Sequence, residues 1–97
     1  DRYLKMVKDI LSDNLRNAGS VTVYAFGSRA KGRAKKFSDL DLALDVHGEE
    51  NTELVWHLMS EFEESDLPFK VDVIDLNDVA PTFYDAIKED LVELCTF

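Results

Sequence analysis

The chain has 97 residues, of which 45% are hydrophobic, so we expect residues 1–97 to form a single domain with one modest core. Its formal net charge of −9 at pH 7 would repel a nucleic-acid backbone, which argues against a general DNA- or RNA-binding protein. No window approaches the roughly 18 apolar residues that a membrane span needs, and the first residues lack a signal-peptide pattern, so we expect no membrane association and a cytoplasmic location.

The first half of the chain predicts a helix followed by two strands. Residues 2–18 carry apolar side chains at helical spacing, and Gly19 suits the end of that helix. The β-rich run at 21–26 predicts the first strand, and the second is expected at 40–46. In the second strand the leucines face the core, whereas the opposite face is acidic and contains Asp39, Asp41, Ala43 and Asp45.

The second half predicts two more helices, and a strand follows each of them. A helix capped by Asn51 or Thr52 should run to about Ser65. A third strand is expected at 70–76, a third helix is expected after a cap at Asp78, and a final strand is expected at 91–95. The buried face of the 51–65 helix is expected to contain Leu54, Val55, Leu58, Met59 and Phe62. This order predicts an α/β (α+β) fold in which helices pack on a small mixed sheet of about four strands.

The sequence leaves two possible roles for one aromatic side chain and predicts only a packing role for the cysteine. Trp56 lies at the edge of its helix's apolar stripe, which is compatible with partial burial in the core or with a contact to another protein. The single cysteine, Cys95, cannot form an internal disulfide and is expected to be a small core residue.

A glycine-serine turn and a basic run follow the first strand. Gly27 and Ser28 stand where the strand ends, and a backbone turn there can aim its N–H groups at an anion. Five of the 11 basic residues then fall within eight positions that contain no acid: Arg29, Lys31, Arg33, Lys35 and Lys36. Such a run is often only a solvated loop, but its position between the turn and an acidic pair favours a small anionic ligand.

The acidic pair is Asp39 and Asp41. At strand spacing both side chains point to the same side, about 6 to 7 Å apart along the chain, so they can bind the same metal ions. Carboxylate oxygens are the ligands that Mg²⁺ prefers, and a third carboxylate from a neighbouring strand would complete the site. Asp72 is preferred for this role over Asp75, because Asp75 lies three residues further on and tends to the opposite face.

Taken together, these motifs resemble those of the minimal nucleotidyltransferases of the polymerase-β superfamily. The shared pattern is glycine-serine, ten intervening residues, an Asp-x-Asp pair and a later aspartate on a separate strand, matched here by Gly27-Ser28, Asp39-Leu40-Asp41 and Asp72. The resemblance implies a polymerase-β-type fold and two Mg²⁺ ions, both bound by Asp39 and Asp41. It also implies that Asp72 ligates the catalytic ion and helps to remove a proton from the attacking hydroxyl.

For the nucleotide, the resemblance implies four binding residues. Gly27 would permit close approach of the backbone, Ser28 would contact the outer phosphates, and Arg29 and Lys31 would neutralise phosphate charge. The implied reaction moves a nucleoside monophosphate, AMP from ATP, onto an acceptor hydroxyl and releases pyrophosphate.

The implied partner follows from the absence of an acceptor-binding domain in so short a chain. Stand-alone domains of this kind resemble antitoxins whose partner is a helical HEPN-domain ribonuclease toxin, and the acceptor would then be a tyrosine of the toxin. Two other hypotheses remain open: a catalytically silent module that binds nucleotide or partner, and transfer to a small molecule such as an aminoglycoside. Metal-dependent ATP binding would count against the silent module.

Overall fold

The computed structural model describes residues 2–16, 19–27, 39–46 and 51–97. Within these ranges the chain forms three helices and a four-stranded mixed sheet, which confirms the predicted fold class. The elements are α1 (Arg2–Leu15), β1 (Thr22–Phe26), β2 (Leu40–Asp45), α3 (Thr52–Glu63), β3 (Val71–Asp75), α4 (Pro81–Ile87) and β4 (Val92–Thr96). None of these helices has the length and apolar character needed to span a bilayer.

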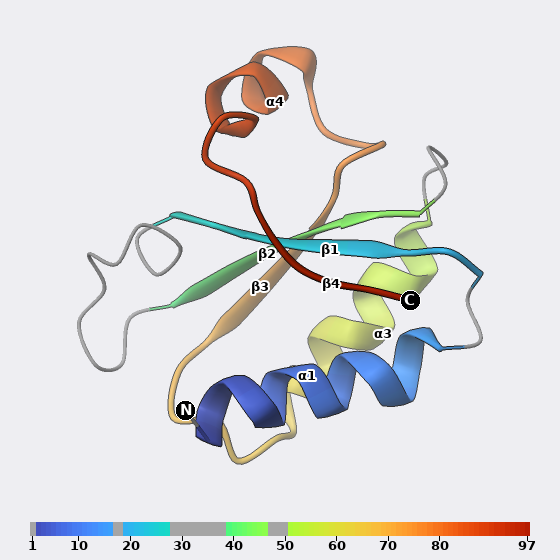
Figure 1. The fold of residues 1–97 in the computed structure, drawn as a ribbon, viewed down its shortest axis with the longest axis vertical. Coiled ribbons are helices and arrows are strands. Elements are labelled where there is room, and N and C mark those ends of the chain that lie inside the picture. The colour runs from blue at the N-terminus through green and yellow to red at the C-terminus, as the bar shows by residue number, and fades with distance from the viewer. Residues whose placement is uncertain (1, 17–18, 28–38, 47–50) are drawn as a thin grey trace.

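The sheet has the strand order β3-β2-β1-β4. Strand β1 pairs antiparallel with both β2 and β4, whereas β2 and β3 are parallel and are joined through α3. Helices α1 and α3 cover one face of the sheet, and α4 lies over the other (Figure 1). The sheet therefore has a core face under α1 and α3 and a second face under α4.

The core lies between the sheet and the pair α1 and α3. Alternation along β2 places Leu40, Leu42 and Leu44 in this core, as predicted. Ala43 lies on the second face, yet it is also fully buried. The reason is its place in a central strand, paired with Tyr24 on one side and Ile74 on the other, so the face expected to be acidic is apolar at its centre.

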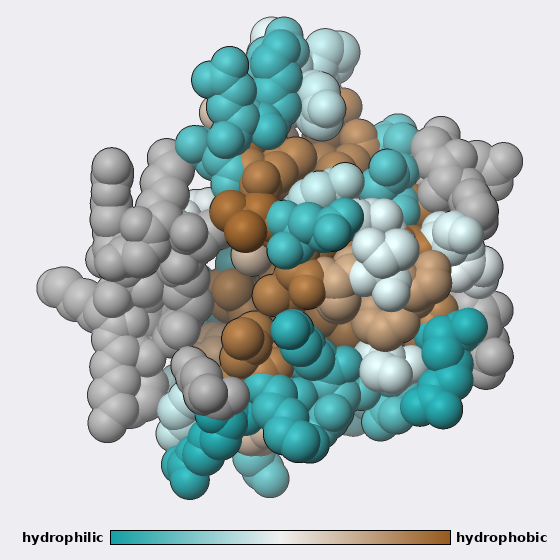
Figure 2. Space-filling view, in the orientation of Figure 1, coloured by the Kyte–Doolittle hydropathy of each residue, from teal (hydrophilic) through white to brown (hydrophobic). Residues whose placement is uncertain are grey.

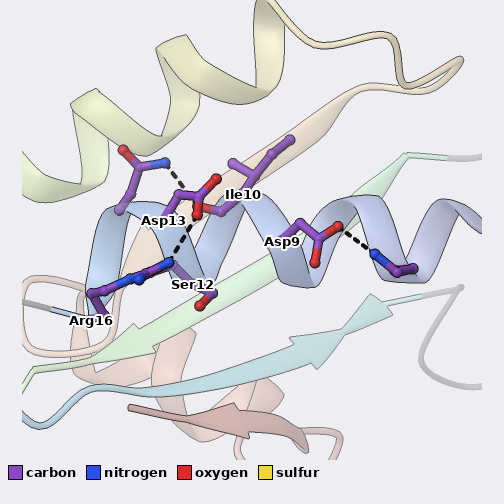
Figure 3. Close-up of polar contacts among 7 residues, drawn as sticks. Asp9, Ile10, Ser12, Asp13 and Arg16 are labelled. Carbon is purple, nitrogen blue, oxygen red and sulfur yellow. Dashed lines mark hydrogen bonds and ion pairs between the residues drawn. The ribbon is translucent and has the colours of Figure 1, made fainter.

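Helix α1 is amphipathic, and its inner side buries Val7, Leu11 and Leu15. Ion pairs lie along its outer side: Lys5 Nζ contacts Asp9 Oδ2 at 2.8 Å, and the Arg16 guanidinium contacts Asp13 (Figure 3). Exposed pairs one helical turn apart stabilise a helix by only about 0.3–0.5 kcal/mol each. The position of α1 therefore depends mainly on the burial of its apolar side chains against the sheet. The structure ends α1 at Leu15, and residues 17–18 of the expected helix lie outside the described residues.

Helix α3 begins at the predicted cap, where Asn51 Oδ1 accepts a hydrogen bond from the Leu54 backbone N–H at 3.1 Å. Its buried residues are Val55, Leu58 and Phe62. The expected burial of Met59 was wrong, because this residue is 37% exposed. Trp56 is 71% exposed, which rules out the alternative that it is partly buried in the core. A turn of about 100° per residue carries each of them away from the narrow stripe that meets the core.

The predicted cap of the last helix was wrong. Helix α4 has Ala80 at the N-cap position without a side-chain cap, and Pro81 opens the helix with a φ angle that its ring presets. Asp78 instead belongs to the turn after β3, where its backbone N–H donates to the Asp75 carbonyl at 3.0 Å. A proline at the first position is therefore the signal that marks this helix.

The β4 edge of the sheet is less buried than the sequence predicts. Cys95 of β4 is only partly buried, although it does pack against the core cluster. Apolar residues gather on the visible surface between α4 and α1, over the β4 edge of the sheet (Figure 2). Val92 of β4 and Phe83 of α4 are among the exposed large hydrophobic residues.

Candidate active site

Two of the predicted metal ligands face each other across neighbouring strands. Asp41 of β2 is the direct partner of Asp72 in the parallel β2–β3 register. Paired residues of adjacent strands project to the same face, and the strands lie about 4.8 Å apart. Both side chains are partly exposed on the second face of the sheet, and Asp39 stands two residues before Asp41 at the entrance to β2.

The three carboxylates influence one another electrostatically. Burial raises the pKa of Asp41, and the neighbouring charges of Asp72 and Asp39 raise it further. Lys70 Nζ lies 3.4 Å from Asp72 Oδ1, and the Lys70 side chain is well exposed whereas that of Asp72 is only partly exposed. A group of like charges of this kind is relieved by a cation.

Gly27 leaves the space that the Asp41 carboxylate occupies. A Cβ atom added at Gly27 would lie only 2.5 Å from Asp41 Oδ2, and Gly27 has a φ angle of +79°, which side-chain-bearing residues rarely adopt. The preceding residue, Phe26, is the register partner of Asp41. Glycine is therefore required here by the carboxylate itself, a reason that sequence reasoning missed because the contact joins two strands.

Asp75 lies on the opposite face, as expected, and its surroundings give it a structural role. It is only 6% exposed. Its Oδ2 accepts from the Asn51 backbone N–H, and its Oδ1 accepts from the Asn77 backbone N–H at 2.9 Å. Asp75 thus ties the start of α3 to the end of β3, and it faces the core and not Asp41.

The predicted phosphate-binding residues Ser28, Arg29 and Lys31 lie outside the described residues, together with the rest of the basic run. Their assignment therefore stays a prediction. Gly27 is the member of that group that the structure describes.

The donor chemistry of the acidic group fits a hard divalent cation, because carboxylate oxygens are the preferred ligands of Mg²⁺. As the side chains lie, no group of three or more His, Cys, Asp or Glu residues in the described ranges is gathered tightly enough to hold a metal ion. Asp41 and Asp72 are register partners, and Asp39 lies two residues before Asp41, close enough for its charge to act on Asp41. The residues would therefore complete a metal site by closing around an ion.

Comparison with known proteins identifies the class. Residues 5–96 match the family described as "Polymerase beta, Nucleotidyltransferase". The chain is 42% identical over 88 residues to "Probable protein adenylyltransferase MntA" of Haemophilus influenzae (strain ATCC 51907 / DSM 11121 / KW20 / Rd), which covers 89% of this chain and 73% of the relative. The family match and this relative together define the protein as a nucleotidyltransferase.

Solved structures share this fold. One is a toxin-antitoxin crystal structure with AMP-PNP, with a TM-score of 0.70 at 22% identity over 91% of this chain and 72% of the other. Another is a tri-AMPylated Shewanella oneidensis HEPN toxin in complex with its MNT antitoxin, with a TM-score of 0.67 at 20% identity over 96% of this chain and 69% of the other. The chain belongs to the polymerase-β nucleotidyltransferase family, and it is similar to the minimal nucleotidyltransferases.

Proposed function

We propose that this protein transfers AMP from ATP to a tyrosine hydroxyl of a partner HEPN-domain toxin, in a reaction that depends on two Mg²⁺ ions. The carrying observation is the pairing of Asp41 with Asp72 beside Gly27, at the edge where the predicted phosphate turn begins. The name of the relative from Haemophilus influenzae, a protein adenylyltransferase, supports the reaction type. The AMPylated toxin in the related complex supports the kind of acceptor.

In this proposal each residue has one role. Asp39 and Asp41 would hold both ions, and Asp72 would hold one of them and accept the proton of the attacking hydroxyl. The hydroxyl oxygen forms a bond to the α-phosphorus while the bond to the β-phosphate oxygen breaks, so pyrophosphate leaves. When bound, the ions supply charge stabilisation at the attacking and departing oxygens.

The nucleotide is held by the glycine-serine turn and the basic run. Backbone N–H groups at Gly27 and Ser28 would bind the outer phosphates, and Arg29 and Lys31 would offset the phosphate charge. The basic run is a positively charged segment within a chain whose net charge is −9. The binding site would therefore select a polyphosphate–metal complex over a bare cation or a bare anion.

The test is transfer of label from α-labelled ATP to the purified partner toxin. Asp41→Asn and Asp72→Asn should each reduce the rate by about 100-fold or more, since each removes a charge that the transition state needs. Asp13→Asn, an equivalent change on the exposed side of α1, should leave the rate unchanged. Labelling at the wild-type rate by both site variants would overturn the assignment.

A second candidate is a silent module that binds the toxin without chemistry. It is favoured by one observation: the described acidic groups are not gathered into a ready metal site. The two functions differ in what Mg²⁺ does. Calorimetry should detect ATP binding that requires Mg²⁺ if the protein is an enzyme, whereas a silent module would bind toxin while binding no ATP.

A further inference from the structure

A cavity of about 490 Å³ lies between α4 and the second face of the sheet. Its volume falls within the roughly 300–1,000 Å³ typical of small-molecule sites. Helix α4 stands over this face of the sheet (Figure 1), and none of the seven residues of α4 is buried. The residues that line the cavity include Tyr24, Asp45, Leu76, Asn77, Tyr84 and Lys88.

The cavity shares a face with the metal-site carboxylates. Alternation along β2 places Asp41, Ala43 and Asp45 on the same face, and the Ala43 partner on β1 is Tyr24. At about 3.3 Å per residue, the cavity begins about 7 Å from Asp41 and extends to about 13 Å from it along the strand. A group attached to a phosphate at the Gly27 edge would therefore reach the cavity without crossing the sheet.

Helix α4 is fastened beside the carboxylates by an aromatic contact. The rings of Phe83 on α4 and Phe26 on β1 meet edge to face, with centroids 6.5 Å apart, and Phe26 is the register partner of Asp41. The next residue, Tyr84, is 41% exposed and lines the same cavity as Tyr24, which lies on β1. Two aromatic residues thus line a cavity on the same face of the sheet as the acidic site.

The polar groups of the cavity form a donor–acceptor pair. Asn77 Nδ2 donates to Asp45 Oδ1 at 3.3 Å. A carboxylate offers about four acceptor positions, and an amide carries both donors and an acceptor, so this pair can also bond to a ligand edge. The edge it complements is an exocyclic amine next to a ring nitrogen, which adenine and cytosine present, whereas uracil has no amine; adenine is selected because the proposed donor is ATP.

We propose that this cavity is the nucleobase subsite and that it takes an adenine ring between Tyr24 and Tyr84, read by Asp45 and Asn77. The inference rests on the proposed function, because the triphosphate must be bound at the Gly27 edge. It adds a specificity-determining site that lies outside the glycine-serine and aspartate motifs. Asp45 accepts from the exocyclic amine, and Asn77 donates to the ring nitrogen.

The experiment compares equilibrium binding of ATP with that of purine riboside triphosphate, which lacks only the exocyclic amine, both with Mg²⁺ and the full chain. Wild-type protein should bind ATP about tenfold more tightly, and Asp45→Ala should bring the two affinities close together. A purely electrostatic role of Asp45 would change both affinities equally, because both ligands carry the same charge. The ratio is also independent of the folded fraction of the variant.

Stacking is tested separately. Tyr84→Ala should weaken both nucleotides about tenfold, whereas Tyr84→Phe should retain wild-type affinity because it keeps the ring. The matched controls lie on the other layer of the fold, where Asp13→Ala and Trp56→Ala should leave both affinities unchanged.

The outcomes separate the two proposals. If the wild-type protein binds both triphosphates equally, or if Tyr84→Ala changes nothing, the adenine subsite is overturned and the proposed transfer from ATP stands. If the protein prefers GTP, CTP or UTP over ATP, the adenine subsite and the choice of ATP as donor both fail. If the wild-type protein binds no nucleotide with Mg²⁺ present, the proposed function fails and the subsite falls with it.

Discussion

Gly27 and the Asp41 carboxylate occupy adjoining space, so a side chain at residue 27 must displace the metal ligand. Gly27→Ala should lower the free energy of unfolding by about 1–2 kcal/mol from the positive φ angle alone, and it should also greatly reduce AMP transfer. Urea denaturation and the labelling assay would measure the two effects.

A matched control exists at Gly19, whose φ angle of +89° is also positive but which precedes β1, at the end of that strand away from Phe26. Gly19→Ala should show a similar loss of stability with normal transfer. Equal transfer rates in both alanine variants would contradict the role given to Gly27.

Asp41 makes the free energy of unfolding of the metal-free protein depend on pH. Because its pKa is raised in the fold above the ordinary value of 3.8, the folded state holds the proton more tightly than the unfolded state does. The stabilisation by protonated Asp41 is present below that ordinary value and is lost as the pH rises through the raised pKa. At neutral pH the charged group therefore opposes folding.

Asp41→Asn should consequently raise the melting temperature of the metal-free protein at pH 7, with little difference from wild type near pH 3. Thermal melts in a chelator would measure this, and added Mg²⁺ should raise the wild-type melting temperature more than that of the variant. A variant that is less stable than wild type at pH 7 would show that Asp41 is a structural residue.

At the scale of elements, β3 presents one aspartate to each face of the sheet. Asp72 shares the second face with Asp41, and Asp75 accepts backbone hydrogen bonds from Asn51 and Asn77 on the core side. A single strand therefore carries one carboxylate placed for chemistry and another placed for folding.

The two substitutions Asp72→Asn and Asp75→Asn should have opposite effects. The first should leave stability within about 0.5 kcal/mol of wild type and abolish transfer. The second should cost about 1–3 kcal/mol, because its amide nitrogen cannot accept from a buried backbone donor. Chemical denaturation and labelling of the toxin, run in parallel, would reveal any exchange of these roles.

At the scale of the whole molecule, the largest apolar side chain contributes little to the core. Trp56 is the one tryptophan of the chain and is 71% exposed on α3, so partial burial in the core is wrong and a protein contact stays a prediction. Its fluorescence therefore reports on one known surface position.

The free protein should show emission typical of a solvated indole, readily quenched by iodide. Trp56→Ala should change the free energy of unfolding by less than about 0.5 kcal/mol. A blue-shifted emission in the free protein, together with a loss of several kcal/mol in the variant, would mean that Trp56 is buried in solution. A blue shift on adding the toxin would support the protein contact.

Much of the fold follows from local pattern. The leucine alternation at 40–44 identified the core face of β2, and the same period of two separated Asp72 from Asp75. The helical spacing at Val7, Leu11 and Leu15 identified α1 in the same way. These inferences succeed because the side-chain direction within one element depends only on its backbone period.

Other features depend on which elements meet. Contacts between residues far apart in sequence bring Gly27 against Asp41, bury Ala43 between two strands and place Tyr84 and Tyr24 at one cavity. Local signals also compete, as at Asp78, where a good capping residue was used in a turn and Pro81 opened the helix. The sequence by itself determined the order of elements, the faces of Asp41, Asp72 and Asp75 and the family, because these follow from spacing along the chain. Only the tertiary structure decided the close contact at Gly27, the exposure of Trp56 and the cavity under α4, because each depends on distances between segments that the chain order does not specify.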